Sequence, residues 1–225
     1  MEKQSVYYQT LLDPGLRLIQ AKENIDTKKH MLDSLLILTA YLLGSLSSAI
    51  IVCRILRLPD PRTAGSNNPG ATNVLRIGGK SAAAITLLGD SLKGLLPLLA
   101  CHYWQVEVLT FALVGMAVFL GHLYPVFFGF QGGKGVATTL GIQFGLAWQI
   151  GGSVALIWLL VAKVMKMSSL AALLSMALAP IMVWLFWPAA ELLMMQILMS
   201  ALLLWRHRSN IRNLLAGTED KITSD

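Results

Sequence analysis

Charged side chains are scarce in this sequence. Only 13% of its 225 residues are charged, whereas 55% are hydrophobic. Soluble globular domains carry about 25% charged residues, so the composition argues against that class. Long apolar runs fill the sequence after Met31 and indicate a membrane protein. We therefore expect an all-α fold, a polytopic helical membrane protein with about seven transmembrane helices.

Cysteine is almost absent, and Cys53 and Cys101 are too few for a disulfide framework. No Cys/His cluster has the spacing of a metal site, so we expect no metal and no cofactor. The net charge of +6 does not indicate a nucleic-acid partner, because the basic residues flank apolar runs instead of forming a basic face.

The first 30 residues lack an apolar segment, so they do not form a signal peptide. They are polar, and Met31 could itself be the initiating residue. The predicted organisation is a polar tail or a mis-called start over 1–30, followed by a single membrane-embedded domain over 31–225.

Seven apolar runs are candidate spans. They cover roughly 33–54, 82–101, 106–128, 136–150, 151–165, 168–187 and 190–205. The fourth and fifth are short and meet at Gly151–Gly152, so they predict either two tilted helices or one re-entrant hairpin. Seven or five full crossings both remain open.

Lys and Arg are confined to the loops on one side of these spans. The loops around 102–106, 149–152 and 187–191 hold neither residue. This asymmetry predicts that the basic loops and the C-terminus lie on the cytoplasmic side of the membrane. Lys28 and Lys29 conflict with that orientation, and a start at Met31 would remove the conflict.

The loop over residues 64–76 is the first candidate binding segment. Its glycines allow close backbone approach to an anion, and Arg76 supplies a fork suited to phosphate. Its candidate ligands are Ser66, Asn68, Gly70, Thr72, Asn73 and Arg76. The alternative is a solvated loop that is rich in turn-forming residues.

The second segment covers residues 121–139. A Gly132-Gly133-Lys134-Gly135 turn ends one span and precedes the next, which would place Lys134 and free N–H groups at a helix N-terminus. Thr138 follows on that helix. The turn is not a Walker A loop, because glycine and not Ser or Thr follows the lysine. The alternative is a flexible hairpin with one orienting lysine.

The third segment, residues 205–219, extends the last span. His207 and Asn210 share a helix face, and Glu219 lies further on. The alternative is a basic stop at the membrane surface. Asp90 and Lys93, three residues apart inside the second span, are interpreted as a structural ion pair rather than as catalytic groups.

In these segments the chain resembles the bacterial acyl-phosphate:glycerol-3-phosphate acyltransferase family, over roughly residues 32–222. The resemblance rests on the Gly-Ser-x-Asn-x-Gly-Ala-Thr-Asn loop with Arg76, the Asp90–Lys93 pair, the Gly121–Thr138 block and the Arg206–Glu219 tail. Two positions depart from the family pattern. Asn67 replaces a usual glycine, and Gln131 replaces a common basic residue.

The resemblance implies transfer of a fatty acyl group from acyl phosphate to the 1-hydroxyl of glycerol 3-phosphate, with membrane lipids around the site. It implies catalytic roles for Ser66, Arg76, Lys134, His207 and Asn210. Substrate-binding roles are expected for Asn68, Gly70, Thr72, Asn73, Gly132, Gly133, Gly135, Thr138 and Glu219. His207 is either a general base or only a hydrogen-bonding group, with a substrate phosphate taking the proton.

The same residues bear on three other functions. An acyl-CoA enzyme with a His-x4-Asp motif is excluded, because no histidine has Asp five residues later. A transporter for a phosphorylated solute would place its site near the bilayer midplane, where only Asp90 and Lys93 are candidates. A lipid-binding scaffold would leave all three segments without a role.

Overall fold

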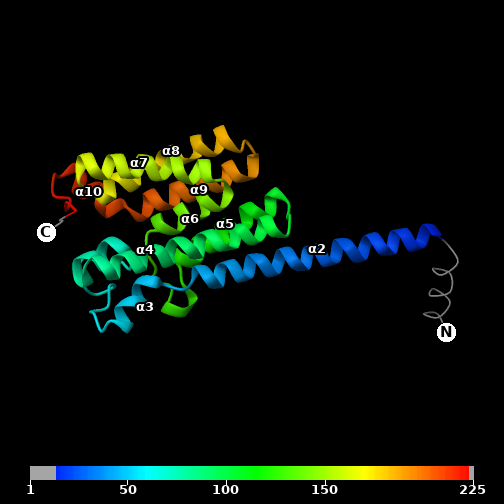
Figure 1. Cartoon of the computed structure of the whole chain (residues 1–225), viewed down its shortest axis with the longest axis horizontal. Coiled ribbons are helices and arrows are strands. Elements are labelled where there is room, and N and C mark those ends of the chain that lie inside the picture. Colours follow the sequence, from blue (N-terminus) through cyan, green and yellow to red (C-terminus); the bar gives the residue numbers. More distant parts are fainter. Residues whose placement is uncertain (1–13, 223–225) are drawn as a thin grey trace. The chain divides into compact units, whose positions relative to one another are not determined.

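The structure is a computed structural model that describes residues 14–222, and every regular element in that range is helical (Figure 1). The helices in chain order are α2 (Pro14–Gly44), α3 (Ser48–Ile55), α4 (Ala71–Tyr103), α5 (Val108–Leu123), the short 3-10 helix η1 (Val126–Phe128), α6 (Val136–Leu146), α7 (Trp148–Met165), α8 (Ser168–Phe186), α9 (Ala190–Arg206) and α10 (Arg208–Leu215). The all-α prediction is confirmed.

The chain divides into two compact units, with the boundary between Leu36 and Ile37. The described part of the first unit is the N-terminal stretch of α2. It begins at Pro14, whose fixed φ suits the first turn of a helix, so part of the predicted tail is helical. The second unit holds the remaining helices and the candidate site.

Among the described residues, four helical segments are long and apolar enough to cross a membrane. They are α4, α5 together with η1, α7 and α8. A fifth crossing arises if α2 and α3, which are bent by 43° at their break, form one span. All seven predicted apolar runs contain helix, but α6 has 11 residues and α9 has 17. The polytopic class is therefore confirmed, whereas the count of seven spans is not.

The predicted boundary at Gly151–Gly152 is wrong. The break between α6 and α7 lies at Ala147, whose backbone is extended with φ −157° and ψ 140°. Gly151 lies inside α7, where a Cβ would come 2.4 Å from Cγ of Phe144. Gly151 therefore allows α7 to pack closely on the end of α6. Small residues are common where membrane helices pack together.

A second glycine changes the direction of α4. Gly79 has φ 78° and ψ −176° inside this helix, a conformation that needs the freedom of glycine. The part of α4 that precedes Gly79 carries Arg76, and the apolar part that follows crosses the membrane. The kink thus gives the segment that carries Arg76 a different direction from the apolar segment that follows.

Buried amides link three helices inside the bundle. Gln143 Nε2 of α6 donates to Gln196 Oε1 of α9 at 3.1 Å, and Gln196 Nε2 donates to Ser200 Oγ at 3.1 Å. Ser200 Oγ in turn donates to the carbonyl of Met176 in α8 at 2.7 Å. Polar groups in a bilayer need protein partners, so this chain of bonds fixes how α6, α8 and α9 pack.

Candidate active site

A cavity of about 760 Å³ lies among α4, α6, α7, α8 and α10. The five residues predicted to be catalytic all line it, namely Ser66, Arg76, Lys134, His207 and Asn210. A second part of the wall is apolar and includes Leu87, Leu140, Val154, Trp158 and Met176. The cavity therefore joins a polar, cationic region to a lining that suits a hydrocarbon chain.

Asn73 shapes the loop that carries Ser66. Its side chain is buried, and its Oδ1 accepts from the backbone N–H of Ser66 at 2.8 Å. Its Nδ2 donates to the carbonyls of Pro61 at 2.9 Å and Ala64 at 3.0 Å. Because both ends of the amide are occupied by the loop, Asn73 organises the loop rather than offering free side-chain donors.

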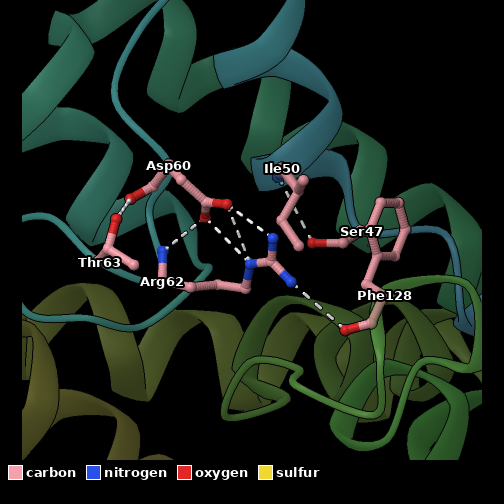
Figure 2. Close-up of polar contacts among 6 residues, drawn as sticks. All are labelled: Ser47, Ile50, Asp60, Arg62, Thr63 and Phe128. Atoms are coloured by element: carbon pink, nitrogen blue, oxygen red, sulfur yellow. Dashed lines mark hydrogen bonds and ion pairs between the residues drawn. The ribbon is translucent and has the colours of Figure 1, made fainter.

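An ion pair anchors the start of the same loop, as Figure 2 shows. The Arg62 guanidinium lies 2.7 Å from Asp60 Oδ2 and also donates to the Phe128 carbonyl at 3.4 Å. The hydrogen bonds from Arg62 hold the pKa of the Asp60 carboxyl below its usual value. The loop is thereby tied to the segment that precedes the Lys134 turn.

Asn67, which departs from the family pattern, lies between Ser66 and Asn68 and has a φ of 55°. This left-handed conformation is the one glycine adopts without strain, and Asn tolerates it better than most residues. The substitution therefore keeps the turn, because the backbone at this position retains its left-handed geometry.

Arg76 and Thr72 face partners from other parts of the chain. Arg76 Nη1 lies 3.2 Å from Asp220 Oδ2, and the hydroxyls of Thr72 and Ser168 are 3.0 Å apart. Ser168 begins α8, so α4 and α8 meet at the rim of the cavity. Both contacts are exposed, and a substrate phosphate can compete for Arg76 without breaking buried structure.

Lys134 and Asn210 form one hydrogen-bonded chain with Glu219. Lys134 Nζ donates to Asn210 Oδ1, and Asn210 Nδ2 donates to Glu219 Oε1 at 2.7 Å. Burial lowers the pKa of the Lys134 ammonium, while Glu219 acts in the opposite direction. Gly135, with φ 94°, then starts α6, so Lys134 lies just before a helix N-terminus as predicted.

His207 is buried at the junction of α9 and α10. Its Nδ1 lies 2.8 Å from the carbonyl of Leu203, and a carbonyl can only accept, so Nδ1 donates. Burial lowers the pKa of His207 to about 4, which leaves the imidazole neutral near pH 7. Its Nε2 is then an acceptor on a residue that lines the cavity, as a general base requires.

The predicted substrate-binding residues divide into two groups. Those on the cavity wall are Asn68, Gly70, Thr72, Asn73, Gly135 and Glu219. Gly132, Gly133 and Thr138 lie outside that wall. The carbonyls of Gly132 and Gly133 accept hydrogen bonds from Arg206, and Thr138 is fully buried in α6. The structure therefore does not place these three residues in contact with the cavity.

The buried ion pair predicted in the second span is present. Lys93 Nζ lies 2.9 Å from Asp90 Oδ1 and donates to the Leu46 carbonyl at 2.7 Å. Asp90 also lies 3.9 Å from His122 Nδ1, and both Asp90 and His122 reach the cavity wall. The pair thus braces the α2–α3 break against α4 and α5.

Several residues that line the cavity are not identified from the sequence alone. Ser168 and Ser169 at the start of α8 could have been suspected, because hydroxyl residues there follow a lysine-flanked turn. Trp158 carried no signal, since a tryptophan in an apolar helix usually faces lipid. Asp220 also lines the cavity, and only the folded chain reveals its contact with Arg76. The contact of Arg206 with the glycine turn, outside the cavity wall, likewise appears only in the folded chain.

Comparison with protein families gives one consistent match. The sequence model described as glycerol-3-phosphate acyltransferase matches residues 34–217. A glycerol-3-phosphate acyltransferase of Methylococcus capsulatus is 56% identical over 188 residues, which are 84% of this chain and 95% of the relative. One of Hydrogenovibrio crunogenus is 56% identical over 189 residues, 81% of this chain and 88% of the relative.

Two crystal structures of PlsY (YgiH), an integral membrane glycerol 3-phosphate acyltransferase, have a similar fold. The glycerol 3-phosphate form has a TM-score of 0.81 and 37% identity, covering 85% of this chain and 96% of that chain. The lysophosphatidic acid form has a TM-score of 0.77 and 36% identity, covering 84% and 94% respectively.

Proposed function

Because the chain belongs to the glycerol-3-phosphate acyltransferase family and is an acyltransferase of phospholipid biosynthesis, we propose that its donor is acyl phosphate. The acyl group would pass to the 1-hydroxyl of glycerol 3-phosphate, giving 1-acyl-glycerol 3-phosphate (lysophosphatidic acid) and phosphate. Membership of the family also decides between an enzyme and a transporter in favour of the enzyme.

The observation that carries this proposal is the two-part cavity. Its polar part gathers Arg76, Lys134 and His207, and its apolar part runs between α4, α7 and α8. Two phosphorylated substrates bring several negative charges together, and fixed cations with neutral donors offset that charge. The acyl chain can lie against the apolar wall while the phosphates occupy the polar part.

The chemistry asks little of the protein beyond orientation and charge stabilisation. The 1-hydroxyl oxygen attacks the acyl carbonyl carbon, and the bond between that carbon and the phosphate oxygen then breaks. Arg76 and Lys134 hold the phosphates, and Ser66 and Asn210 orient the reacting groups. The hydroxyl proton passes to Nε2 of His207 or to a substrate phosphate oxygen. Acyl phosphate is already activated, so no covalent intermediate with the enzyme is needed.

We place the polar part of the cavity at the cytoplasmic face of a bacterial inner membrane. The segments that carry Arg76, Lys134 and Arg206 belong to the Lys- and Arg-rich side, which is the cytoplasmic side of most membrane proteins. There the soluble glycerol 3-phosphate meets an acyl chain that is held in the membrane.

The decisive experiment is an acyl-transfer assay with the purified protein in detergent micelles. Palmitoyl phosphate with labelled glycerol 3-phosphate is expected to yield labelled lysophosphatidic acid, whereas palmitoyl-CoA yields none. Product from palmitoyl-CoA but not from palmitoyl phosphate would overturn the proposed donor. The variant Lys134→Ala serves as the impaired control, with less product expected at the same glycerol 3-phosphate concentration. A chain that begins at Met31 tests the predicted domain boundary and is expected to keep full activity.

A further inference from the structure

Arg206 connects the helix that ends at His207 with the glycine turn of Lys134. It is the last residue of α9, and its Nη2 donates to the Gly132 carbonyl at 2.8 Å and to the Gly133 carbonyl at 3.1 Å. Hydrogen bonds from a charged donor are worth about 1.5–3 kcal/mol each, roughly twice a neutral bond. One guanidinium therefore fixes two successive carbonyls of the turn.

The end of α5 holds the opposite side of the turn. The Gly133 N–H donates to the His122 carbonyl at 3.2 Å. A Cβ on Gly132 would come 2.0 Å from that same carbonyl oxygen, so the backbone of the turn lies directly on α5. The turn is thus clamped between His122 and Arg206.

This clamp sets the direction of one particular N–H group. The Gly133 carbonyl and the Lys134 N–H belong to the same peptide unit, and in a trans peptide the two groups point in opposite directions. Arg206 binds the carbonyl, so the N–H points away from the guanidinium. Within residues 14–222 this N–H has no hydrogen-bond acceptor, although Lys134 itself lines the cavity.

We propose that Arg206 is a positioning residue for acyl transfer, which orients the Gly133–Lys134 peptide so that the Lys134 N–H donates to an anionic oxygen of the substrates. The inference rests on the proposed function, because it concerns the same cavity. The positive charge at the carbonyl end of the peptide also strengthens the N–H as a donor. The acceptor is either a phosphate oxygen or the oxyanion that forms on the acyl carbonyl.

Arg208 supplies a matched control on the same stretch of chain. Its guanidinium lies 4.8 Å from the ring centre of Trp205 and donates to the Trp205 carbonyl at 3.4 Å, with no contact to the glycine turn. Arg206→Ala and Arg208→Ala therefore remove the same charge and the same side-chain length. They differ in whether the turn loses its two hydrogen bonds.

The test measures kcat and KM for glycerol 3-phosphate, with palmitoyl phosphate as donor. Removing a preorganised hydrogen-bond donor from an oxyanion site lowers kcat about 10²–10³-fold. We expect kcat/KM of Arg206→Ala to fall by a factor of that order. Arg208→Ala is expected to match the wild type. Arg206→Lys, which keeps one charged donor, is expected to lie between them. Millimolar guanidinium should restore Arg206→Ala but not Lys134→Ala.

The kinetic parameter that changes, KM or kcat, distinguishes the two possible acceptors of the Lys134 N–H. A higher KM for glycerol 3-phosphate at unchanged kcat identifies its phosphate as the acceptor, whereas a lower kcat at unchanged KM identifies the oxyanion. Wild-type kcat and KM in Arg206→Ala would overturn the inference, as would a loss that guanidinium leaves unrepaired at an unchanged Tm. If Arg206→Ala does not fold, undiminished kcat/KM in Arg206→Lys overturns it instead. Failure of the proposed function is distinct, because the wild type itself would then be inactive with palmitoyl phosphate.

Discussion

Gly133→Ala is the change whose effect the geometry defines most sharply. A Cβ at this position would lie 2.4 Å from His122 Nε2 and 2.9 Å from the Pro69 carbonyl oxygen. The imidazole contact falls 1.0 Å short of the 3.4 Å at which ordinary van der Waals contact begins. Neither neighbour has open space to move into, since His122 is buried in the end of α5 and Pro69 O belongs to the backbone.

The strain is therefore relieved by movement of the turn. Gly133 precedes Lys134 directly, so a shift of about 1 Å displaces the Lys134 ammonium and the adjacent N–H by a similar distance. Displacements of about 1 Å at reacting groups cost about 100-fold in rate. We expect kcat/KM of Gly133→Ala to fall by about that factor, which corresponds to about 2.7 kcal/mol of transition-state stabilisation.

Gly152→Ala is the matched control. Gly152 lies inside α7, and a Cβ there meets no atom within 4 Å. Alanine is favoured over glycine inside a helix by about 1 kcal/mol, so this variant should keep full activity and an equal or higher Tm. Both variants are assayed for lysophosphatidic acid in detergent, with Tm measured alongside. Full activity of Gly133→Ala at an unchanged Tm would refute the reasoning.

Three further predictions follow from the same contacts. Burial lowers the pKa of His207 to about 4, so kcat/KM of the wild type should fall as the pH drops through that value and the imidazole becomes protonated. His207→Gln should lack this fall near pH 4. A fall that persists in the variant contradicts the general-base role. The change in kcat/KM caused by protonation of the substrate phosphate, whose pKa is about 6, should remain in the wild type and in His207→Gln. Lys134→Met should raise KM for glycerol 3-phosphate about tenfold to 150-fold, the equivalent of one charge-assisted bond of about 1.5–3 kcal/mol; an unchanged KM contradicts phosphate binding. Asp90→Asn should lower the free energy of unfolding by about 3–5 kcal/mol, because it leaves the buried Lys93 without a charged partner and with the Leu46 carbonyl still bound. Thermal unfolding in detergent measures this loss, and Lys93→Met added to Asp90→Asn should recover part of it; equal Tm in all three proteins would contradict a buried pair.

Local sequence was enough to predict which segments meet. Glycine, small polar residues and single cations occur together at residues 64–76, 132–138 and 205–219. Charged side chains are costly inside a membrane, so their presence beside apolar spans indicates a function. The structure brings Ser66, Lys134 and His207 to one cavity.

Other features depend on partners that lie far apart in the sequence. The sequence alone predicts a break at Gly151–Gly152, because small residues do not by themselves distinguish flexibility from close packing. The contact of Gly151 with the ring of Phe144, which shows close packing, exists only in the folded chain. Asn73 was counted as a substrate donor, since its two contacts with the loop carbonyls exist only after the loop has folded. The length of an apolar run does not show whether it forms one membrane-spanning helix or contains a short helix such as α6.

The cavity draws its polar groups from both ends of the second unit, with Ser66 early in the chain and Asn210 and Glu219 close to its C-terminus. During translation, Ser66 and Lys134 are therefore synthesised well before His207 and Asn210. A nascent chain that extends only to the end of α9 contains the loop of Ser66 but lacks the imidazole of His207 and the amide of Asn210. With the roles proposed above, such a chain would be unable to transfer an acyl group.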